Sequence, residues 1–102
     1  MKFSIKYSKL AMLDLEHIWD EVLSASASVE VTAGYVEALL ALVEGQADFP
    51  ESGAPLYYED TFTGYRFVVY KAYIAFYRTE GTAIFVDRIL HSKSDYLRVL
   101  GL

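Results

Sequence analysis

The stretch that decides the fold runs from residue 65 to residue 90 and reads YRFVVYKAYIAFYRTEGTAIFVDRIL. It contains three runs rich in β-branched and aromatic residues, at 65–70, 73–79 and 82–90, and such runs are typical of strands. Lys71-Ala72 and Glu80-Gly81 separate the runs, and each pair has the length of a tight hairpin turn. The C-terminal part of the chain is therefore predicted to form antiparallel strands.

The segment before this sheet predicts one strand and two helices. Residues 2–7 alternate polar and apolar side chains, as a half-buried strand does. Ser8 stands where the cap of a helix over about 9–25 belongs, and Ser28 caps a second helix over about 29–47 that Pro50 and Gly53 prevent from continuing. The apolar stripes of the two helices are Leu15, Ile18, Trp19 and Val22, and Val36, Leu39, Leu40, Val43 and Ala47.

Two segments remain, one between the helices and the sheet and one at the end of the chain. Residues 49–64 contain both prolines and no sustained period, so a long irregular loop is predicted there, and residues 93–100 predict a short helix. The fold class is therefore α+β, with an N-terminal strand, a two-helix hairpin on an antiparallel sheet of about four strands, and a short C-terminal helix. We expect a single domain over residues 1–102.

Cysteine content and hydropathy limit the class of protein. The chain has no cysteine, which excludes disulfides and thiolate metal sites, and we expect no cofactor and no metal. Its first residues lack the apolar core of a signal peptide, and no run approaches the roughly 18 apolar residues of a membrane span. We expect a cytoplasmic protein that does not contact a membrane.

Charge divides the chain into two unlike halves. The net charge is −5, which disfavours a non-specific nucleic-acid binder because Lys and Arg must neutralise phosphates. Residues 1–64 hold three basic and eleven acidic side chains (−8), whereas residues 65–102 hold six basic and three acidic ones (+3). The halves are expected to face different partners.

If both hairpin turns have two residues, Tyr70 pairs with Tyr73, Arg66 with Tyr77, Tyr77 with Ile84, and Tyr73 with Arg88. This register predicts that the two helices cover a face made of Phe67, Val69, Ile74, Phe76, Ala83, Phe85 and Ile89. The opposite face is then free for a partner and carries Arg66, Val68, Tyr70, Tyr73, Ala75, Tyr77, Ile84, Val86, Arg88 and Leu90. The alternative is that the opposite face lines a second small core beneath the loop and the C-terminal helix.

Several single residues have ordinary structural interpretations. Trp19 is predicted in the core, and His17 and the acidic run of the first helix, Asp14 to Glu21, are predicted on its solvated face. Arg78 lies near a turn on the helix-covered face, where a structural salt bridge with an acidic residue of the helices is the preferred interpretation.

Three motifs occur in a fixed order along the chain. Residues 7–18, YSKLAMLDLEHI, fit the pattern Tyr-Ser-x-x-Ala-x-x-Asp-Leu-x-x-Ile, and residues 49–55, FPESGAP, fit Phe-Pro-x-x-Gly-x-Pro. The third set lies in the sheet and after it: Tyr65-Arg66, Phe76-Tyr77-Arg78, Arg88-Ile89-Leu90-His91 and Asp95-Tyr96. Together, along essentially the whole chain, they resemble the RelE/ParE superfamily of bacterial toxins.

The resemblance implies the toxin of a type II toxin–antitoxin module of the plasmid-stabilisation kind, which inhibits growth until a cognate antitoxin covers its working surface. ParE-like members bind DNA gyrase and catalyse nothing themselves, whereas RelE-like members cleave mRNA in the ribosome. The assembly expected is a homodimer or a toxin–antitoxin heterotetramer. The residues expected to contact the target or the antitoxin are Arg66, Tyr70, Tyr73, Tyr77, Arg88, His91, Lys93 and Tyr96.

The two chemistries ask for different residues. Under the nuclease alternative His91 is the acid or base and Arg66 and Arg88 stabilise the transition state. Val68 and Ile74 occupy positions where RelE-like nucleases tend to be basic, and a charge of −5 disfavours docking on ribosomal phosphate. ParE-like action is therefore preferred, although Lys93-Ser94 replaces an Arg-Arg pair of many ParE-like members. A non-toxic interaction module of the same fold is the third alternative.

Overall fold

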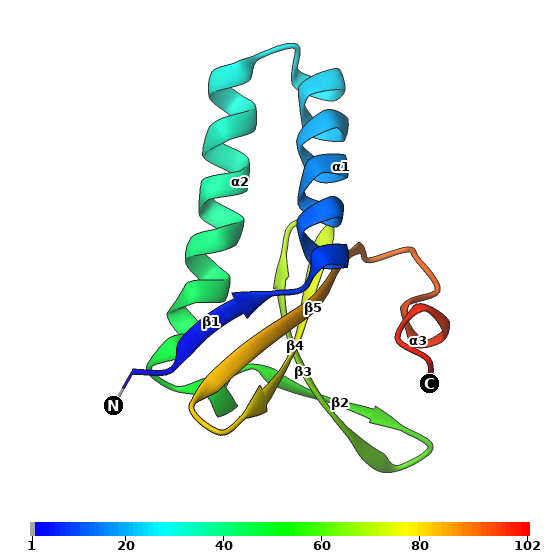
Figure 1. The fold of residues 1–102 in the computed structure, drawn as a ribbon. Coiled ribbons are helices and arrows are strands. Elements are labelled where there is room, and N and C mark those ends of the chain that lie inside the picture. The colour runs from blue at the N-terminus through cyan, green and yellow to red at the C-terminus, as the bar shows by residue number, and fades with distance from the viewer. Residues whose placement is uncertain (1) are drawn as a thin grey trace.

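The computed structural model describes residues 2–102. Within that range the chain forms a five-stranded sheet of order β1-β5-β4-β3-β2, and a helical hairpin stands on one face of the sheet (Figure 1). The strands are β1 (Ser4–Tyr7), β2 (Ala54–Tyr58), β3 (Thr61–Tyr70), β4 (Tyr73–Glu80) and β5 (Ala83–His91). The helices are α1 (Lys9–Ser26), α2 (Val29–Glu44) and α3 (Tyr96–Val99), and the 3₁₀ turns η1 (Gly45–Ala47) and η2 (Pro50–Ser52) follow α2. The α+β architecture is confirmed.

Both predicted helix caps are present. Ser8 Oγ accepts a hydrogen bond from the backbone N–H of Ala11 at 2.9 Å, and Ser28 Oγ accepts one from Val31 at 3.2 Å. These oxygens satisfy N–H groups that the first turn of a helix leaves without a partner. α1 ends where Ala27 adopts a left-handed conformation with φ of 55°. The helical hairpin therefore begins and ends close to where its cap residues predict.

The prediction of an irregular loop over 49–64 is wrong for most of that segment. It contains β2 and the start of β3, which pair as a hairpin whose turn residues Glu59 and Asp60 both have positive φ (49° and 65°). The turn contains no glycine, so its sequence lacks the usual hairpin signal. Pro55 is tolerated because β2 is an edge strand, where a missing N–H costs no ladder hydrogen bond.

The predicted register is correct between β3 and β4 and wrong between β4 and β5. Tyr70 pairs with Tyr73 as expected, but Gly81 and Thr82 form the next turn, so Tyr77 lies opposite Val86. A bulge at Phe76 and Tyr77 then leaves Asp87 without a partner in the β4–β5 register, and Tyr73 lies opposite His91 and not opposite Arg88. One extra residue in a ladder exchanges the faces of every residue beyond it.

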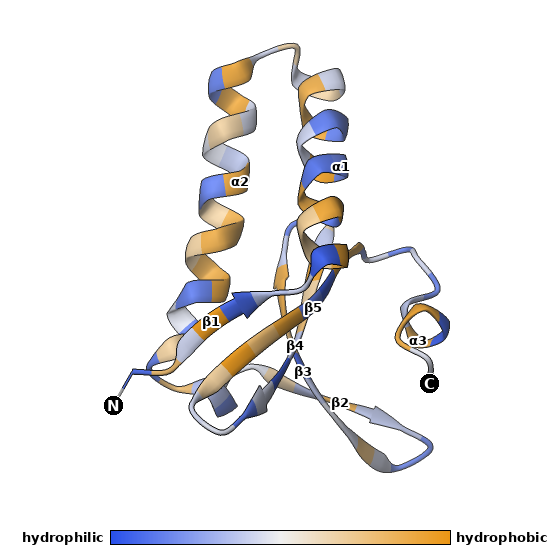
Figure 2. Ribbon diagram, in the orientation of Figure 1, coloured by the Kyte–Doolittle hydropathy of each residue, from blue (hydrophilic) through white to orange (hydrophobic). Residues whose placement is uncertain are grey.

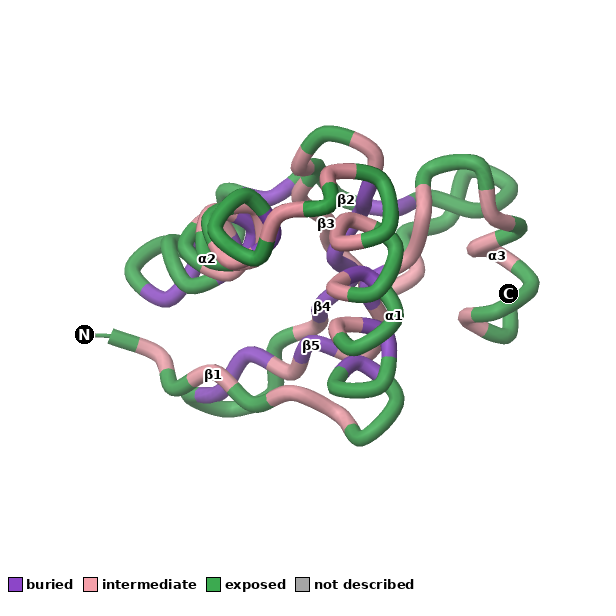
Figure 3. Tube along the Cα trace, turned by 90° about the horizontal axis from the view of Figure 1, so that it is seen from above, coloured by how far each residue is buried: buried purple, intermediate pink, exposed green. Residues whose placement is uncertain are grey.

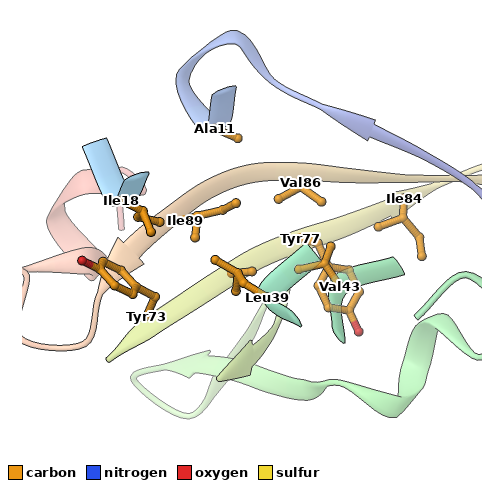
Figure 4. Close-up of a cluster of buried hydrophobic side chains, with 10 residues drawn as sticks. Ala11, Ile18, Leu39, Val43, Tyr73, Tyr77, Ile84, Val86 and Ile89 are labelled. Carbon is orange, nitrogen blue, oxygen red and sulfur yellow. The ribbon is translucent and has the colours of Figure 1, made fainter. Parts of the chain in front are cut away.

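The helices cover the opposite face of the sheet from the one predicted. The helix-covered face comprises Tyr73, Ala75, Tyr77, Ile84, Val86 and Ile89, which pack against Ala11, Ile18, Leu39 and Val43 of α1 and α2 (Figure 4). Seen from above, buried residues of β4 and β5 lie between and beneath the two helices (Figure 3). Of the seven residues predicted to lie under the helices, Ile89 is the one that belongs to this core. The tyrosines are buried because their hydroxyls find acceptors, which hydropathy alone does not predict.

The second face, called here the far face, forms a smaller core. Leu56, Ile74 and Phe76 are buried there, with Tyr65, Phe67 and Leu90 from the sheet and Tyr96, Leu97 and Leu100 from the C-terminal segment packed around them. A second small core was the alternative that the sequence left open, and it exists, built from the phenylalanine side of the sheet. Neither face of the central strands is therefore free for a partner.

The two long helices carry both polar and apolar residues. Figure 2 shows hydrophilic and hydrophobic residues interspersed along α1 and α2. Over residues 2–102, no helix combines the length and hydropathy needed to cross a bilayer.

Candidate partner-binding surface

Arg88 is held by an acidic residue of α1. Its Nε and Nη2 donate to the two carboxylate oxygens of Asp14 at 2.8 and 2.9 Å. The backbone N–H of Ile89 donates to the same carboxylate at 2.9 Å, at the edge of β5 that β1 no longer covers. The hydrogen bond to Asp14 raises the pKa of Arg88. Asp14 is only 8% exposed, so its predicted place on a solvated helix face is wrong.

Arg66 and Tyr77 hold the loop that follows α2. Arg66 Nη1 donates to the carbonyl oxygens of Glu51 and Gly53 at 3.2 and 3.1 Å. The hydroxyl of the fully buried Tyr77 donates to the Pro50 carbonyl at 2.6 Å and accepts from the Gly53 N–H at 3.2 Å. Both side chains therefore use hydrogen-bonding groups for structural contacts, and fewer of these groups remain to bind an external ligand.

The three residues expected to act together in a nuclease are far apart. Arg66 lies opposite Tyr77 and His91 opposite Tyr73, four positions apart on β4. That separation is roughly 13 Å along the strand and about 10 Å across two strand spacings. Arg88 is directed to Asp14 on α1. The fold therefore does not bring these three side chains to one phosphodiester.

Three predicted residues and one that was not predicted lie on neighbouring segments at the end of the sheet, where the β3–β4 turn contacts the exit of β5. The Ser92 N–H donates to the Ala72 carbonyl at 2.8 Å and joins the two segments. We call Tyr70, Lys71, His91 and Lys93 the turn surface. His91 stacks edge-on against Tyr73 with ring centres 5.4 Å apart, and its Nδ1 accepts a hydrogen bond from the Lys93 N–H at 3.1 Å.

Aromatic rings pack beneath the turn surface and support it. Tyr35 of α2 contacts Tyr70 and Tyr73 edge-on, with ring centres 5.1 and 6.1 Å away. Lys71, whose φ is 50°, places its ammonium 5.5 Å from the ring centre of Tyr35 and 5.6 Å from that of Tyr70. A cation above aromatic rings is weakly held and stays accessible to an acidic partner. Lys71 and Lys93 are both exposed.

Tyr73 supports the turn surface without belonging to it. Its hydroxyl donates to the Glu21 carboxylate of α1. Burial, and next the hydrogen bond to Glu21, raise the pKa of Tyr73 above its ordinary value. The hydrogen bond from this phenol to Glu21 fixes α1 over the end of β4.

The remaining predicted residues have structural positions. The Tyr96 ring lies 5.2 Å from that of Phe76 in the far-face core. Arg78 forms the expected salt bridge, but its partners are Asp87 and Glu80 of the sheet, each at 2.9 Å, and no acidic residue of the helices is involved. The hydrogen bond to Asp87 is the largest cause of its raised pKa.

Trp19 lies partly exposed in a shallow groove between α1 and α2, where a place in the core was expected. The groove has a volume of about 460 Å³ and is lined by Met12, Leu15, Glu16, Trp19, Asp20 and Val36. It combines apolar walls with two carboxylates, a pattern suited to a basic amphipathic segment.

Sequence reasoning missed Tyr35, Lys71, Glu21 and Asp14. Tyr35 could have been found, because Tyr35, Leu39 and Val43 recur every four residues and share one side of α2. The pairing of Asp14 with Arg88 gave no local signal, because 74 residues separate them. Among residues 2–102, no group of three or more His, Asp or Glu side chains is placed to hold a metal ion.

Comparison with known proteins adds independent observations. A family model described as the ParE toxin of the type II toxin–antitoxin system parDE matches residues 5–96. No curated protein sequence matches the chain significantly.

Solved structures resemble the chain over nearly its whole length. A chain of the chromosomal ParDE system from P. aeruginosa has a TM-score of 0.73 and 23% identity, and the alignment covers 88% of this chain and 96% of that one. A chain of the toxin–antitoxin complex RelBE2 from Mycobacterium tuberculosis has a TM-score of 0.64 and 17% identity, with coverage of 92% and 95%. YafQ from E. coli has a TM-score of 0.52 and 17% identity, with coverage of 89% and 94%. At these identities the likeness shows a common fold.

Proposed function

The chain belongs to the ParE toxin family of type II toxin–antitoxin systems, and from this premise we propose that it arrests growth by binding a protein target such as DNA gyrase in the cytoplasm. A cognate antitoxin neutralises it. The proposed target contact is the turn surface, in particular Lys71, His91 and Lys93.

The placement of the arginines is the observation that carries this proposal. Ribonucleolytic attack needs an acid, a base and cations around one phosphate. Here Arg88 pairs with Asp14, Arg66 donates to loop carbonyls, and His91 lies roughly 16 Å from Arg66 by strand geometry. Binding a protein target needs no such convergence of groups on one phosphate. The turn surface offers exposed Lys71 and Lys93 beside aromatic rings.

The antitoxin is proposed to occupy the groove between α1 and α2. Glu16 and Asp20 give that groove a negative edge, and Met12 and Trp19 give it apolar walls. A basic amphipathic segment complements both features. This assignment leaves the turn surface and the antitoxin site on different elements, so variants can separate them.

The test is expression of the chain without an antitoxin, followed by growth, a DNA-damage reporter and mapping of mRNA ends. We expect growth arrest with damage signalling and no new mRNA ends. The double variant Lys71→Glu, Lys93→Glu should lose at least tenfold in killing, because it reverses two charges on the turn surface. The matched control Lys2→Glu, Lys9→Glu makes the same change of charge elsewhere and should still kill.

His91→Ala distinguishes the nuclease alternative. A catalytic acid or base contributes roughly 10²–10⁴ in rate, so a nuclease would lose its toxicity, whereas a binding surface should lose only part of it. mRNA cleavage within translated codons that disappears in His91→Ala would overturn the proposal. Absence of any growth phenotype in the unmodified chain would leave the non-toxic module as the better description.

A further inference from the structure

Phe49 is exposed in a position where the surrounding loop is fixed. The residue is 74% exposed, the largest exposure of any large hydrophobic residue in the described part of the chain. The residue lies between η1 and η2, at the opposite end of the sheet from the turn surface. A single exposed phenylalanine is ordinary, but this one lines a groove together with other apolar residues, and a contiguous apolar surface marks a candidate binding site.

Hydrogen bonds from several elements hold this loop in one conformation. Ser52 Oγ donates to Gln46 Oε1 at 2.6 Å, and the Ser52 N–H donates to the Phe49 carbonyl at 2.9 Å. Tyr77 and Arg66 bind the backbone of the residues that follow. A Cβ at Gly53 would lie 2.1 Å from the Tyr77 hydroxyl oxygen, so the loop and the sheet are in close contact. Phe49 is thus presented on a fixed support, and little order needs to be gained when a partner binds.

The loop forms one wall of a groove, here called the loop groove. Its volume is about 630 Å³, and it is lined by Phe3, Asp48, Phe49, Pro50, Glu51, Ser52, Thr79 and Gly81. The Phe3 N–H donates to the Ala47 carbonyl at 2.8 Å, which fixes the opposite wall. Its walls are mostly apolar, and its two charged lining residues, Asp48 and Glu51, are both acidic.

The charge of the groove identifies the chemistry of its occupant. Asp48 and Glu51 repel phosphate, so RNA and DNA are disfavoured. Two arginines lie near the same end of the sheet, but Arg66 donates to Glu51 and Gly53 carbonyls and Arg78 pairs with Asp87 and Glu80. An apolar groove with an acidic edge complements a segment that alternates basic and apolar side chains.

We propose that the loop groove binds an extended, basic and apolar peptide segment of a partner protein, with Phe49 as the anchor and Asp48 and Glu51 as the charge contacts. The occupant inserts one apolar side chain beside Phe49 and Phe3, and its flanking Lys or Arg residues meet the two carboxylates. This surface is separate from both sites of the proposed function, and its test does not depend on toxicity.

The experiment uses the whole chain and a fluorescein-labelled peptide, Gly-Lys-Leu-Lys-Phe-Lys-Gly. Fluorescence anisotropy measures the affinity at low and high salt, and amide chemical shifts locate the site. We expect shifts at Phe3, at 48–52 and at Thr79. Affinity should weaken roughly tenfold in Phe49→Ala, the loss expected for an exposed aromatic anchor. A peptide with Glu in place of Lys and a single-stranded RNA oligonucleotide should not bind.

Matched variants separate the groove from the general acidity of the chain. Asp48→Asn with Glu51→Gln should weaken binding and reduce its salt dependence, while Glu30→Gln with Glu37→Gln removes the same charge from exposed positions of α2 and should have no such effect. Val31→Ala removes an exposed apolar side chain elsewhere and serves as the control for Phe49→Ala. Binding unchanged by Phe49→Ala, shifts confined to α1 and α2, or binding of the RNA would each overturn the proposal. So would a dimer of the chain that Phe49→Ala dissociates, because the occupant would then be a second copy.

Discussion

The two faces of the sheet bury similar aromatic rings but handle polar atoms differently. On the helix-covered face, the Tyr73 and Tyr77 hydroxyls find hydrogen-bond acceptors, and the buried Asp14 carboxylate at its margin binds Arg88. On the far face the core is made of Phe76, Ile74 and Leu56, and its main ion pair, that of Arg78, lies at the surface. Which side chains are buried in this protein therefore depends on whether their polar atoms have hydrogen-bond partners, as well as on hydropathy.

The largest expected effect comes from breaking the ion pair on the helix side. Arg88→Ala leaves the 8%-exposed Asp14 without its guanidinium, and removing one partner of a buried pair costs about 3–5 kcal/mol. Arg78→Ala removes a pair whose arginine side chain is 40% exposed, and such pairs contribute roughly 0–1 kcal/mol. Urea unfolding of both variants measures the two costs.

A double variant decides whether the cost of Arg88→Ala arises from the unpaired carboxylate. Asp14→Ala together with Arg88→Ala removes both charges and should recover part of the stability lost in Arg88→Ala alone. Equal losses for Arg88→Ala and Arg78→Ala would show that the two ion pairs do not differ as their burial indicates.

Particular residues show how far sequence alone could predict this structure. Ser8 and Ser28 cap the helices where a local pattern says they should, because a cap depends on only four consecutive residues. The faces of the sheet were assigned wrongly because the phenylalanines are more apolar than the tyrosines, while a tyrosine with a buried acceptor is equally well accommodated. The bulge at Asp87 and the pair formed by Asp14 and Arg88 depend on contacts between distant segments, which leave no local pattern.

The candidate site was predictable in part for the same reason. Tyr70, His91 and Lys93 were expected to share a surface. Tyr70 and His91 lie opposite Tyr73 from its two neighbouring strands, and the Lys93 N–H donates to His91. Arg66 and Arg88 were expected to join them, but their hydrogen-bond partners on the loop and on α1 could not be inferred from spacing.

Two glycines differ in the space around them, and alanine substitutions at both positions test this difference. Ala at Gly53 would place its Cβ 2.1 Å from the buried Tyr77 hydroxyl oxygen, and overpacking of this kind costs about 1–3 kcal/mol. Gly34 lies inside α2, and beyond the adjoining backbone of that helix no atom lies within 4 Å of an added Cβ, so Gly34→Ala should stabilise the protein by about 0.5–1 kcal/mol. Thermal unfolding of the two variants should therefore shift in opposite directions.

The cause of the Gly53→Ala loss can be checked by removing the atom that the new Cβ meets. In the background Tyr77→Phe, Gly53→Ala should cost less than in the unmodified chain, because the contact at 2.1 Å is gone, although the ring carbons Cζ and Cε1, at 2.9 and 3.0 Å from the new Cβ, remain. An undiminished cost in that background would show that the hydroxyl oxygen is not the cause of the loss.

The smallest expected effect concerns the one tyrosine whose buried hydroxyl oxygen has no hydrogen-bond partner among residues 2–102, Tyr7. Tyr77→Phe removes a hydroxyl that binds Pro50 and leaves that carbonyl unpaired, at a cost of about 1–3 kcal/mol, whereas Tyr7→Phe should leave neutral-pH stability unchanged or slightly higher.

Burial, and next the charge of Glu44, raise the pKa of Tyr7 from 10.0 to about 12. The folded state therefore holds this proton more tightly than the unfolded chain, so the contribution of Tyr7 is complete below pH 10 and is lost as pH rises toward 12. Urea midpoints between pH 9 and pH 12 should fall less steeply in Tyr7→Phe than in the unmodified chain, and parallel curves would show that Tyr7 ionises equally easily in both states.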